Sequence, residues 1–336
     1  MRISVAMAVR NGERYLSPLL DSLARQTAPP HELVVTDDGS EDATPALLEA
    51  FAERAGFPVR VERFGERRGH VEGFMRAAWR CEGDAIAFCD ADDVWREEKL
   101  EVCGRELAAT GATLVMHTTR VVDRELADLG YDWPALGPGR VVPPLGLTGL
   151  DVHAPGMAMA FERRLLHLAD FDTRPPSRYG LGRRMLHDEW VLFLAGAVGR
   201  IALIAEPLLL YRQHEANDSG GWIGDRRGMS LRPALEDYVR AAEHTAACAD
   251  YLAATRTEDP EVDERLAEAA RAYRTAARNW SLRAALYRAA DRRSRLRMLR
   301  ELMAGGAYRE REVGGFGRAA LGKDLAGVAL RVSARR

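Results

Sequence analysis

Three clusters of acidic residues adjoin hydrophobic runs, and they are the first residues of this chain that could do chemistry. Asp37 and Asp38 follow one run, the segment 90–93 (Asp-Ala-Asp-Asp) follows a second, and Asp188 and Glu189 directly precede a third. In an open α/β sheet, ligands bind outside the carboxyl ends of the strands. We therefore expect the first two clusters to meet at one ligand, and the third can supply a general base.

The tripeptide Asp90-Ala91-Asp92 is an Asp-x-Asp motif after a hydrophobic strand. Two carboxylates at a strand end can hold a divalent cation, such as Mg²⁺ or Mn²⁺, that also takes phosphate oxygens as ligands. The alternative is a turn in which Asp92 or Asp93 caps a following helix. The motif gains weight from residues 37–40 (Asp-Asp-Gly-Ser), which occupy an equivalent place two βα units earlier and offer a carboxylate to a nucleobase.

The elements that must position these residues alternate along the chain. Strand-like runs at 3–9, 33–37, 59–62 and 84–89 alternate with helical patterns near 13–26, 43–55, 70–81 and 96–109. Repeated βα order predicts a mostly parallel sheet with helices on its faces. Because βα crossovers are right-handed, the loops after the first, second and fourth strands should lie along one edge and form one pocket.

Further elements follow in the second half of the chain. We predict a β-rich run at 113–122, an irregular Pro- and Gly-rich connection at 132–156, a helix beginning near His187, and strands at 200–204 and 207–212. Residues 217–221 (Asn-Asp-Ser-Gly-Gly) favour a mobile loop that folds over a ligand. From about Leu231 the pattern is helical, with breaks near 259–260, 305–306 and 314–315.

The C-terminal segment 291–336 holds twelve Arg or Lys residues against five Asp or Glu. Four apolar residues in it are spaced for one helix face: Leu296, Leu299, Leu302 and Met303. One interpretation is a docked helix with a solvated Arg face, and the other is peripheral attachment to an anionic membrane. We favour the docked helix because three glutamates, at 301, 310 and 312, dilute the basic charge.

Composition limits the classes of protein that remain. The 336 residues are 47% hydrophobic, which allows a full-sized core, and no apolar run is long enough to span a bilayer. The first nine residues predict a strand rather than a signal peptide, so we expect a soluble, cytoplasmic protein. The four cysteines form no CxxC pair, which argues against disulfides and structural zinc. A net charge of -2 argues against nucleic acid as a partner.

Five motif blocks taken together resemble family 2 glycosyltransferases of the GT-A fold: 9–16 (VRNGERYL), 37–40 (DDGS), 90–95 (DADDVW), 187–190 (HDEW) and 211–214 (YRQH). The D-x-D-D-V-W block and the late Y-R-x-H block resemble the rhamnosyltransferase-like branch in particular. The resemblance covers about two thirds of the chain. It implies a GT-A nucleotide-sugar-binding and catalytic domain at 1–220 and a helical region at 221–336.

The resemblance also implies roles for individual residues. The nucleotide-sugar site would comprise Val9, Arg10, Asn11, Glu13, Asp38, Arg68, Asp90 and Ala91, with Asp38 holding the base. The metal ligands would be Asp90, Asp92 and His214, and the cation would be Mn²⁺ or Mg²⁺. Arg10 stands where many relatives carry Tyr, and its guanidinium plane can still stack on a base. For Arg67 and Arg68, solvent exposure is the alternative to phosphate contact.

On the acceptor side, Asp188 matches the family's catalytic base, and Glu189 is the second candidate. Residues expected to bind the acceptor or sugar are Asp93, Trp95, Gly156, Met157, Glu189 and Trp190. Trp95 and Trp190 could stack on a sugar or simply cover the core; for Trp190 we favour the acceptor. We expect His187 to support the helix that carries Asp188, rather than to take part in catalysis.

The resulting hypothesis is an inverting, metal-dependent glycosyltransferase. One carboxylate deprotonates the acceptor hydroxyl, and the metal neutralises the departing diphosphate. The branch favours rhamnose-type donors on dTDP, with UDP-sugars next; the acceptor could be a polysaccharide, a lipid-linked sugar or a natural product, and an oligomer is possible. The alternatives are a non-catalytic sugar-nucleotide binder and a nucleotidyltransferase. The latter is disfavoured because residues 10–13 do not form a Gly-rich, basic phosphate loop.

Overall fold

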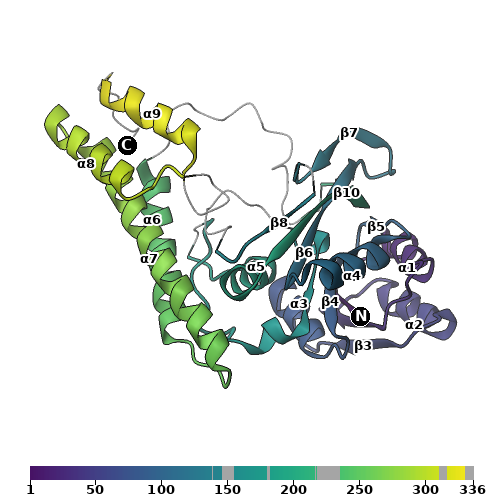
Figure 1. Ribbon diagram of the computed structural model, residues 1–336. Helices are drawn as coiled ribbons and strands as arrows, with labels where there is room; N and C mark the ends of the chain where they lie inside the picture. Colours follow the sequence, from purple (N-terminus) through teal and green to yellow (C-terminus); the bar gives the residue numbers. More distant parts are fainter. Residues whose placement is uncertain are drawn as a thin grey trace.

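The computed structural model describes residues 1–137, 139–145, 155–179, 182–215, 217, 235–309 and 316–329. Its centre is a sheet with strands β1 (Ile3–Val9), β2 (Glu32–Asp37), β3 (Val59–Arg63), β4 (Ala85–Asp90), β5 (Val94–Trp95), β6 (Leu114–Val122), β7 (Asp128–Trp133), β8 (Arg140–Val142), β9 (Met159–Glu162) and β10 (Ile201–Arg212). The strand order is β3-β2-β1-β4-β9-β6-β10-β5, with β7 on β6 and β8 on β10 (Figure 1). The prediction of an α/β fold is confirmed.

The first four long strands form the parallel half of the sheet. β1 lies between β2 and β4, and β2 pairs with β3, all in parallel. In this register Val9 lies opposite Asp37, and Ala8 lies opposite Asp90. The carboxyl ends of β1, β2 and β4 therefore lie side by side, which confirms the predicted common edge.

Helices cover both faces of the sheet. They are α1 (Leu16–Ala24), α2 (Thr44–Arg54), α3 (His70–Trp79), α4 (Lys99–Thr110) and α5 (His187–Val198), with the short 3₁₀ turns η1 (Gly156–Ala158) and η2 (Arg163–His167). Alternate residues of β1 serve the two faces: Ala6 packs in the core with α3 and α5, whereas Val5 and Met7 pack in the core with α1, α2 and α4. This alternation is the period-2 geometry of a strand buried on both sides.

Two sequence-based predictions in the second half need correction. The connection predicted to be irregular at 132–156 contains β8 and the end of β7, which pair with β10 and β6. The strands predicted at 200–204 and 207–212 form one strand, β10. Its pairing with β6 shifts register on both sides of Pro207, which has no N–H to donate. The predicted mobile loop at 217–221 lies outside the described residues except for Asn217.

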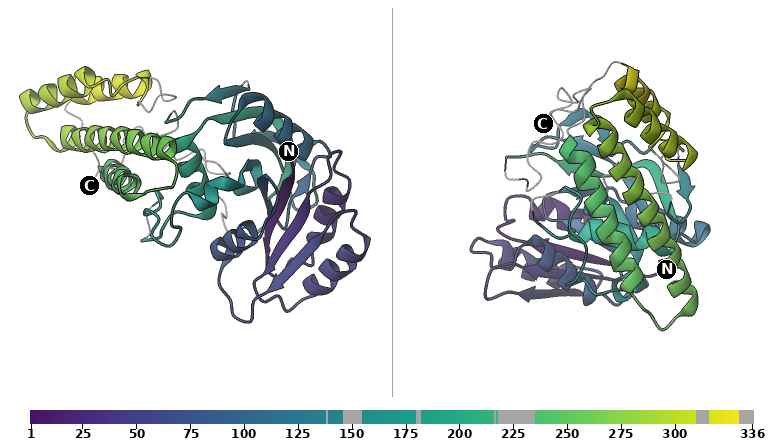
Figure 2. Two further views of the ribbon diagram at one scale, coloured as in Figure 1. Left: turned by 60° about the horizontal axis from the view of Figure 1, so that its bottom comes forward. Right: turned by 90° about the vertical axis from the view of Figure 1, so that its left-hand side faces the viewer.

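The C-terminal region is helical, as predicted. Its helices are α6 (Leu235–Ala254), α7 (Pro260–Arg288), α8 (Arg292–Ala304) and α9 (Arg318–Ala329). α7 begins at the predicted break, where the side chain of Asp259 accepts a hydrogen bond from the backbone N–H of Glu261. Buried residues of α6 and α7, such as Leu252 and Leu266, belong to the same core as α3 and α5. The helical pair is thus packed directly on the α/β region (Figure 2).

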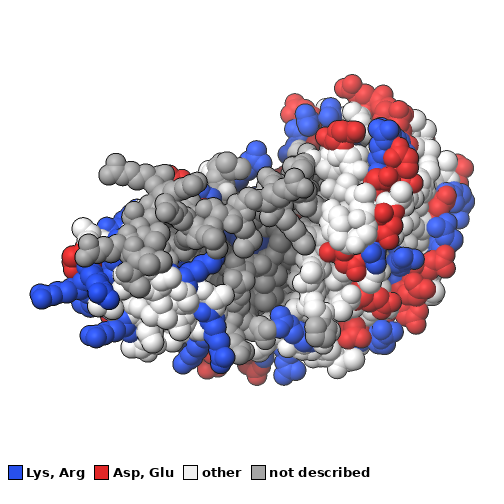
Figure 3. All heavy atoms as spheres, turned by 90° about the horizontal axis from the view of Figure 1, so that it is seen from above, with Lys and Arg blue, Asp and Glu red and all other residues white. Residues whose placement is uncertain are grey.

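Helices α8 and α9 form a second, smaller core with the ends of α6 and α7. Leu299 and Leu302 of α8 are buried in it, whereas Leu296 and Met303 are exposed. The single apolar face predicted for α8 is therefore divided between the core and the surface. Seen from above, Lys and Arg side chains gather over this helical end (Figure 3). Within the described residues, no helix is long and apolar enough to cross a membrane.

Candidate active site

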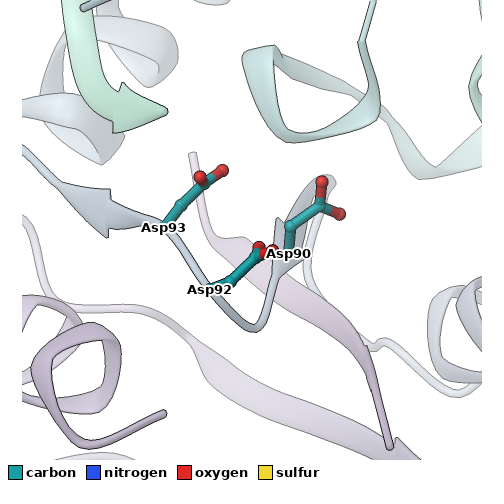
Figure 4. Close-up of side chains that lie close together, drawn as sticks. All are labelled: Asp90, Asp92 and Asp93. Atoms are coloured by element: carbon teal, nitrogen blue, oxygen red, sulfur yellow. The ribbon is translucent and has the colours of Figure 1, made fainter. Parts of the chain in front are cut away.

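The segment that joins β4 to β5 presents three carboxylates together. Ligand oxygens of Asp90, Asp92 and Asp93 all lie within 4.8 Å of one another (Figure 4). Asp90 ends a buried strand, and the chain turns at once into β5, so all three side chains are confined to one short loop. Neither Asp92 nor Asp93 caps the next helix, because α4 begins only at Lys99 with Glu98 at its N-cap. The capping alternative is therefore wrong.

Asp93 is the inner member of the cluster. Its side chain is fully buried, and Oδ1 accepts a hydrogen bond from the backbone N–H of Arg212 at 3.0 Å. Burial, with the nearby charges of Asp92 and Asp90, raises its pKa well above the usual value. Its Oδ2 is buried without a hydrogen-bond partner, and an oxygen in this position can take a proton or a cation. Asp93 was expected to bind the acceptor or sugar, and the structure places it beside the candidate metal ligands Asp90 and Asp92.

Lys99 lies beneath the acidic cluster and was not recognised from the sequence. Its side chain is fully buried, Nζ donates a hydrogen bond to the carbonyl of Met157 at 2.7 Å, and Nζ lies 3.5 Å from the ring centroid of Trp95. Burial lowers its pKa to about 8. This ammonium therefore lies over one face of the Trp95 ring, just after the acidic cluster in the chain, and its hydrogen bond to Met157 connects η1 to the same region.

The end of β10 reaches the acidic cluster through two residues. Nε2 of His214 lies 2.9 Å from Oδ2 of Asp92. The guanidinium of Arg212 donates hydrogen bonds to the carbonyls of Asp92 and Arg124 at 2.7 and 2.8 Å. Tyr15 stacks on His214 with ring centroids 4.6 Å apart, and Arg212 lies 4.6 Å from the same Tyr15 ring. His214 was expected from the sequence to be a metal ligand, whereas the supporting contacts of Arg212 and Tyr15 were not expected.

The loops after β1 and β2 are joined by reciprocal hydrogen bonds. The backbone N–H of Asn11 donates to Oγ of Ser40 at 2.9 Å, and the backbone N–H of Glu41 donates to Oδ1 of Asn11 at 2.9 Å. Glu13 accepts from the backbone N–H of Ala43 at 2.9 Å. The two loops are therefore held as one unit, with Asn11 in the left-handed region at φ 50°.

Gly12 brings this loop unit against the acidic loop. A Cβ atom at Gly12 would lie 2.8 Å from a methyl carbon of Val9 and 3.9 Å from the Cβ of Ala91. Only glycine fits the first of these contacts without displacing a neighbour. Val9 is buried and Arg10 is exposed, so of these two residues predicted to bind the nucleotide only Arg10 has a side chain at the surface.

Asp38 connects the end of β2 to the loop before α3. Its two carboxylate oxygens accept hydrogen bonds from the backbone N–H groups of Arg68 and Gly69 at 2.6 and 2.9 Å. Its own backbone N–H donates to the carbonyl of Val9 at 2.9 Å. Asp38 therefore orders the loop that carries Arg68, whose side chain is half exposed and lies 3.6 Å from Glu72.

Asp188 lies at the N-terminus of α5, next to η1. Its Oδ1 accepts a hydrogen bond from the backbone N–H of Glu189 at 2.7 Å, and a helix N-terminus favours a negative charge. A Cβ at Gly156 would lie 3.5 Å from the Cβ of Asp188 and 2.9 Å from Nε2 of His187. Gly156 therefore lets η1 approach the start of α5, and the same η1 contacts Lys99 through Met157.

His187 packs against the core beneath the start of α5, consistent with the expectation that it supports the helix that carries Asp188. Its ring stacks on Phe74 at 4.2 Å between centroids and meets the edge of Phe88 at 4.8 Å. Burial, with the neighbouring His70 in a smaller part, lowers its pKa well below the usual value. A neutral imidazole packed between aromatic rings fixes the backbone from which Asp188 projects.

Glu189 caps the helix and forms a buried ion pair. Its Oε2 accepts a hydrogen bond from the backbone N–H of Leu186 at 3.0 Å, and Oε1 lies 3.7 Å from Nε of Arg178. The two side chains are only 10% and 12% exposed. With these partners, the structure gives Glu189 a role in holding α5, and Asp188 is the better placed of the two candidate bases.

Trp190 lies in the core. Its side chain has no exposed surface and is surrounded by the rings of Phe171, Phe193 and Tyr251. The expectation that its ring stacks on the acceptor is wrong, because a ring without exposed surface has no face to offer. Trp95 is 3% exposed, and Met157 is 2% exposed, so their side chains also belong mainly to the core.

Comparison with known proteins agrees with this geometry. Residues 4–166 match the family model described as Glycosyl transferase family 2. This segment contains the joined loops after β1 and β2 and the acidic cluster, but it ends before α5, which carries Asp188, and before β10, which leads to His214. The match supports a glycosyltransferase of the family 2 type.

Curated relatives are similar over part of the chain. An uncharacterised glycosyltransferase, alr2836, of Nostoc sp. is 27% identical over 222 residues, which are 65% of this chain and 66% of the relative. The putative teichuronic acid biosynthesis glycosyltransferase TuaG of Bacillus subtilis is 30% identical over 99 residues, which are 30% of this chain and 39% of the relative. The chain thus spans less than two thirds of the length of these relatives.

A solved structure extends the similarity of fold to the helical region. Residues 1–349 of S. aureus TarS in complex with UDP-GlcNAc superpose with a TM-score of 0.55, over 100% of this chain and 93% of that chain, at 17% identity. At this identity the likeness establishes the fold alone, which is GT-A with a C-terminal helical region.

Proposed function

We propose that the family 2 glycosyltransferase domain at residues 4–166, completed by α5 and β10, transfers a sugar from a nucleoside diphosphate to an acceptor hydroxyl with inversion. One observation carries this proposal: three carboxylates on one loop have ligand oxygens within 4.8 Å of one another, at the same sheet edge as Asp38 and joined through η1 to Asp188. A metal-diphosphate site and a separate base are the two requirements of a single displacement at the anomeric carbon.

The acidic cluster fits a hard divalent cation. Asp90 and Asp92 are partly exposed, Asp93 has a buried oxygen without a hydrogen-bond partner, and His214 lies against Asp92. Carboxylate oxygens are the ligands that Mg²⁺ and Mn²⁺ prefer, and a cation would satisfy the buried oxygen. When bound there, the metal would neutralise the charge that develops on the departing diphosphate.

The joined loops after β1 and β2 are the proposed nucleoside pocket. Asn11 and Ser40 hold the loops together, and Asp38 orders the segment that carries Arg68. Each carboxylate oxygen of Asp38 already accepts one backbone hydrogen bond and retains a second lone pair for a base N–H. Arg10, exposed beside this pocket, offers a guanidinium plane to the base.

Asp188 is the proposed base. It takes the proton from the acceptor hydroxyl as the hydroxyl oxygen attacks the anomeric carbon, and the bond to the diphosphate breaks on the opposite face. His187 and Glu189 act on the backbone beneath it, the first by packing and the second by capping. A glycosidase would instead need a second carboxylic acid, kept protonated, on the leaving-group side.

The proposed donors are dTDP-rhamnose-type sugars and UDP-sugars. The motif blocks at 90–95 and 211–214 support the first, and the solved TarS structure with UDP-GlcNAc supports the second. The proposed acceptor is a hydroxyl of a glycan, a lipid-linked sugar or a natural product.

The test is release of nucleoside diphosphate from a panel of dTDP-, UDP- and GDP-sugars with Mn²⁺ or Mg²⁺. We expect slow hydrolysis of one donor class, lost with a chelator and restored by metal. Asp92→Asn should lose this activity, whereas Asp250→Asn, a change of the same kind at an exposed position on α6, should keep it. If no donor is turned over but one binds with an affinity that depends on Asp38, the protein is a non-catalytic sugar-nucleotide binder.

A further inference from the structure

We propose that the exposed face of α8 binds the surface of an anionic lipid bilayer. This basic face consists of Arg292, Arg293, Leu296, Arg297, Arg300 and Met303, all of which are exposed. At 3.6 residues per turn the six side chains fall within an arc of about 140°. Four cationic side chains and two large apolar ones therefore project from one side of a single helix.

Among the described residues, no acidic side chain pairs with the arginines of this face. Within the described residues, none of the four arginines forms an ion pair or a side-chain hydrogen bond. The acidic side chains exposed on α8 and at its N-cap are Glu301 and Asp291, and Oδ1 of Asp291 accepts a hydrogen bond from the backbone N–H of Ser294. The four guanidinium groups are thus available to lipid phosphates. Figure 3 shows Lys and Arg gathered over this end of the molecule.

The apolar residues favour a bilayer over a soluble polyanion as the partner. Leu296 is 37% exposed and Met303 is 52% exposed, and both lie on the arc occupied by the arginines. A dissolved polyphosphate or acidic polysaccharide would leave these side chains in water. At a bilayer they enter the boundary between headgroups and acyl chains while the arginines contact the phosphates.

The opposite side of α8 is anchored, so the basic face has a fixed orientation. Leu299 and Leu302 are buried in the core shared with α7 and α9. Arg295, also buried, donates hydrogen bonds to the carbonyls of Ala289 and Gly327 at 2.8 and 3.3 Å. Docking of one side and lipid contact by the other are therefore compatible. The two interpretations drawn from the sequence, a docked helix and attachment to an anionic membrane, therefore do not exclude each other.

The neighbouring helix α9 is held by a buried ionic network. Asp324 has no exposed surface, forms an ion pair with Arg283 at 2.9 Å, and accepts hydrogen bonds from the hydroxyls of Tyr287 and Tyr308, each at 2.7 Å. Because Asp324 points inward, the next residue, Leu325, points outward and is 48% exposed. The helix packed beside α8 is therefore fixed to α7 by buried polar contacts.

The basic face lies far from the acidic cluster. Figures 1 and 2 place α8 beyond α6 and α7, at the end of the molecule opposite β2 and β3. Changes on this face should leave chemistry with dissolved substrates intact. The inference does not depend on the proposed function, and a failure of either leaves the other standing.

The test is sedimentation of the full chain with vesicles of phosphatidylcholine containing phosphatidylglycerol, compared with pure phosphatidylcholine. We expect binding to the anionic vesicles alone, weakened by salt. Arg297→Gln with Arg300→Gln should reduce the partition coefficient about 25-fold, at roughly fivefold for each basic residue. The matched control is Arg25→Gln with Arg105→Gln, two exposed arginines of the α/β region, and it should bind as the parent chain does.

A second pair of substitutions distinguishes a lipid bilayer from a dissolved polyanion as the partner. Leu296→Asn with Met303→Asn keeps every charge, and we expect it to weaken vesicle binding about tenfold or more. Suppose that this double variant keeps full vesicle binding, that the Arg297 and Arg300 variant loses it, and that soluble polyphosphate competes equally well. The partner would then be a dissolved polyanion and not a bilayer. No sedimentation of the parent chain with anionic vesicles, or equal binding by all variants, overturns the proposal. An unchanged thermal midpoint shows that each variant is folded.

Discussion

Nε2 of His214 lies 2.9 Å from Oδ2 of Asp92, although 122 residues separate them in the chain. This contact joins the end of β10, which lies outside the segment that matches the family model, to the loop after β4, which lies inside it. Tyr15 holds the imidazole by stacking, so the loop after β1 takes part as well. One histidine thus connects three parts of the sheet edge at the proposed metal site.

We predict that His214→Ala weakens Mn²⁺ binding at least tenfold, because the site loses either a ligand or the partner that orients Asp92. Isothermal calorimetry with Mn²⁺ alone measures this without any donor. Gln213→Ala, at the adjacent position, serves as the control, and its affinity should match that of the parent chain. Equal Mn²⁺ affinity in all three proteins would show that His214 has no part in metal binding.

For Asp188→Asn, the expected result is loss of turnover with retained donor binding. Removal of the base should slow transfer about 10²- to 10⁴-fold. The donor contacts Asp38 and the acidic cluster in the proposed site, so its dissociation constant, measured by calorimetry, should not change. A collapse of donor binding would instead identify Asp188 as a residue that maintains the structure.

The neighbouring substitution Glu189→Gln should act on stability. It removes the charge from a buried ion pair with Arg178, and breaking a buried ion pair by removing one partner costs about 3–5 kcal/mol. Urea unfolding measures the change. Glu97→Gln, which breaks an ion pair in which both side chains are 55% exposed, should cost less than about 1 kcal/mol. If the two variants unfold alike, the ion pair of Glu189 with Arg178 contributes no more than an exposed ion pair.

The buried imidazole of His187 makes stability depend on pH. Its pKa is well below the usual value in the folded protein, whereas in the unfolded chain it returns to about 6.5. Below pH 6.5 the unfolded chain therefore binds a proton that the folded chain excludes, and stability falls as the pH falls. The contribution is up to about 1.4 kcal/mol per pH unit.

In His187→Gln this contribution is absent, so the slope of unfolding free energy between pH 5 and 6 should be smaller than in the parent chain by that amount. Unfolding in urea at several pH values gives both slopes. His117 and His244, whose pKa values are also lowered by burial, remain in both proteins and cancel in the comparison. Parallel slopes would mean that His187 is protonated equally in the folded and unfolded states.

Much of the fold was predictable because it depends on local patterns. The βα alternation through α4, the helix beginning at His187 and the break at Asp259 each follow from periodicity or capping within a few residues. The common sheet edge that carries Asp37 and Asp90, on the strands to either side of β1, also followed, since parallel strands have their carboxyl ends at the same edge. Prediction was wrong at Pro207, where tertiary pairing with β6 continues a strand that local propensity ends.

The candidate site was predictable only in part. The position of acidic residues at a strand end identified Asp90 and Asp92. Nothing in the local sequence distinguishes them from Asp93, which differs from them in being fully buried. Trp190 follows Asp188 by two residues, yet the helix turns it into the core, since helical residues two apart point in different directions. Lys99 and Arg212 have no local pattern that marks them, because their partners Met157 and Asp92 are distant in sequence.

The sequence alone determined the alternation of strands and helices through α4, the sheet edge that carries the carboxylates and the helical nature of the C-terminal region. Those properties arise from side-chain periodicity and turn chemistry, which act over a few neighbouring residues. Only the tertiary structure decided which carboxylate is buried, which tryptophan is in the core, and which side of α8 remains exposed. Burial depends on what packs against a residue from distant parts of the chain, and local sequence does not contain that information.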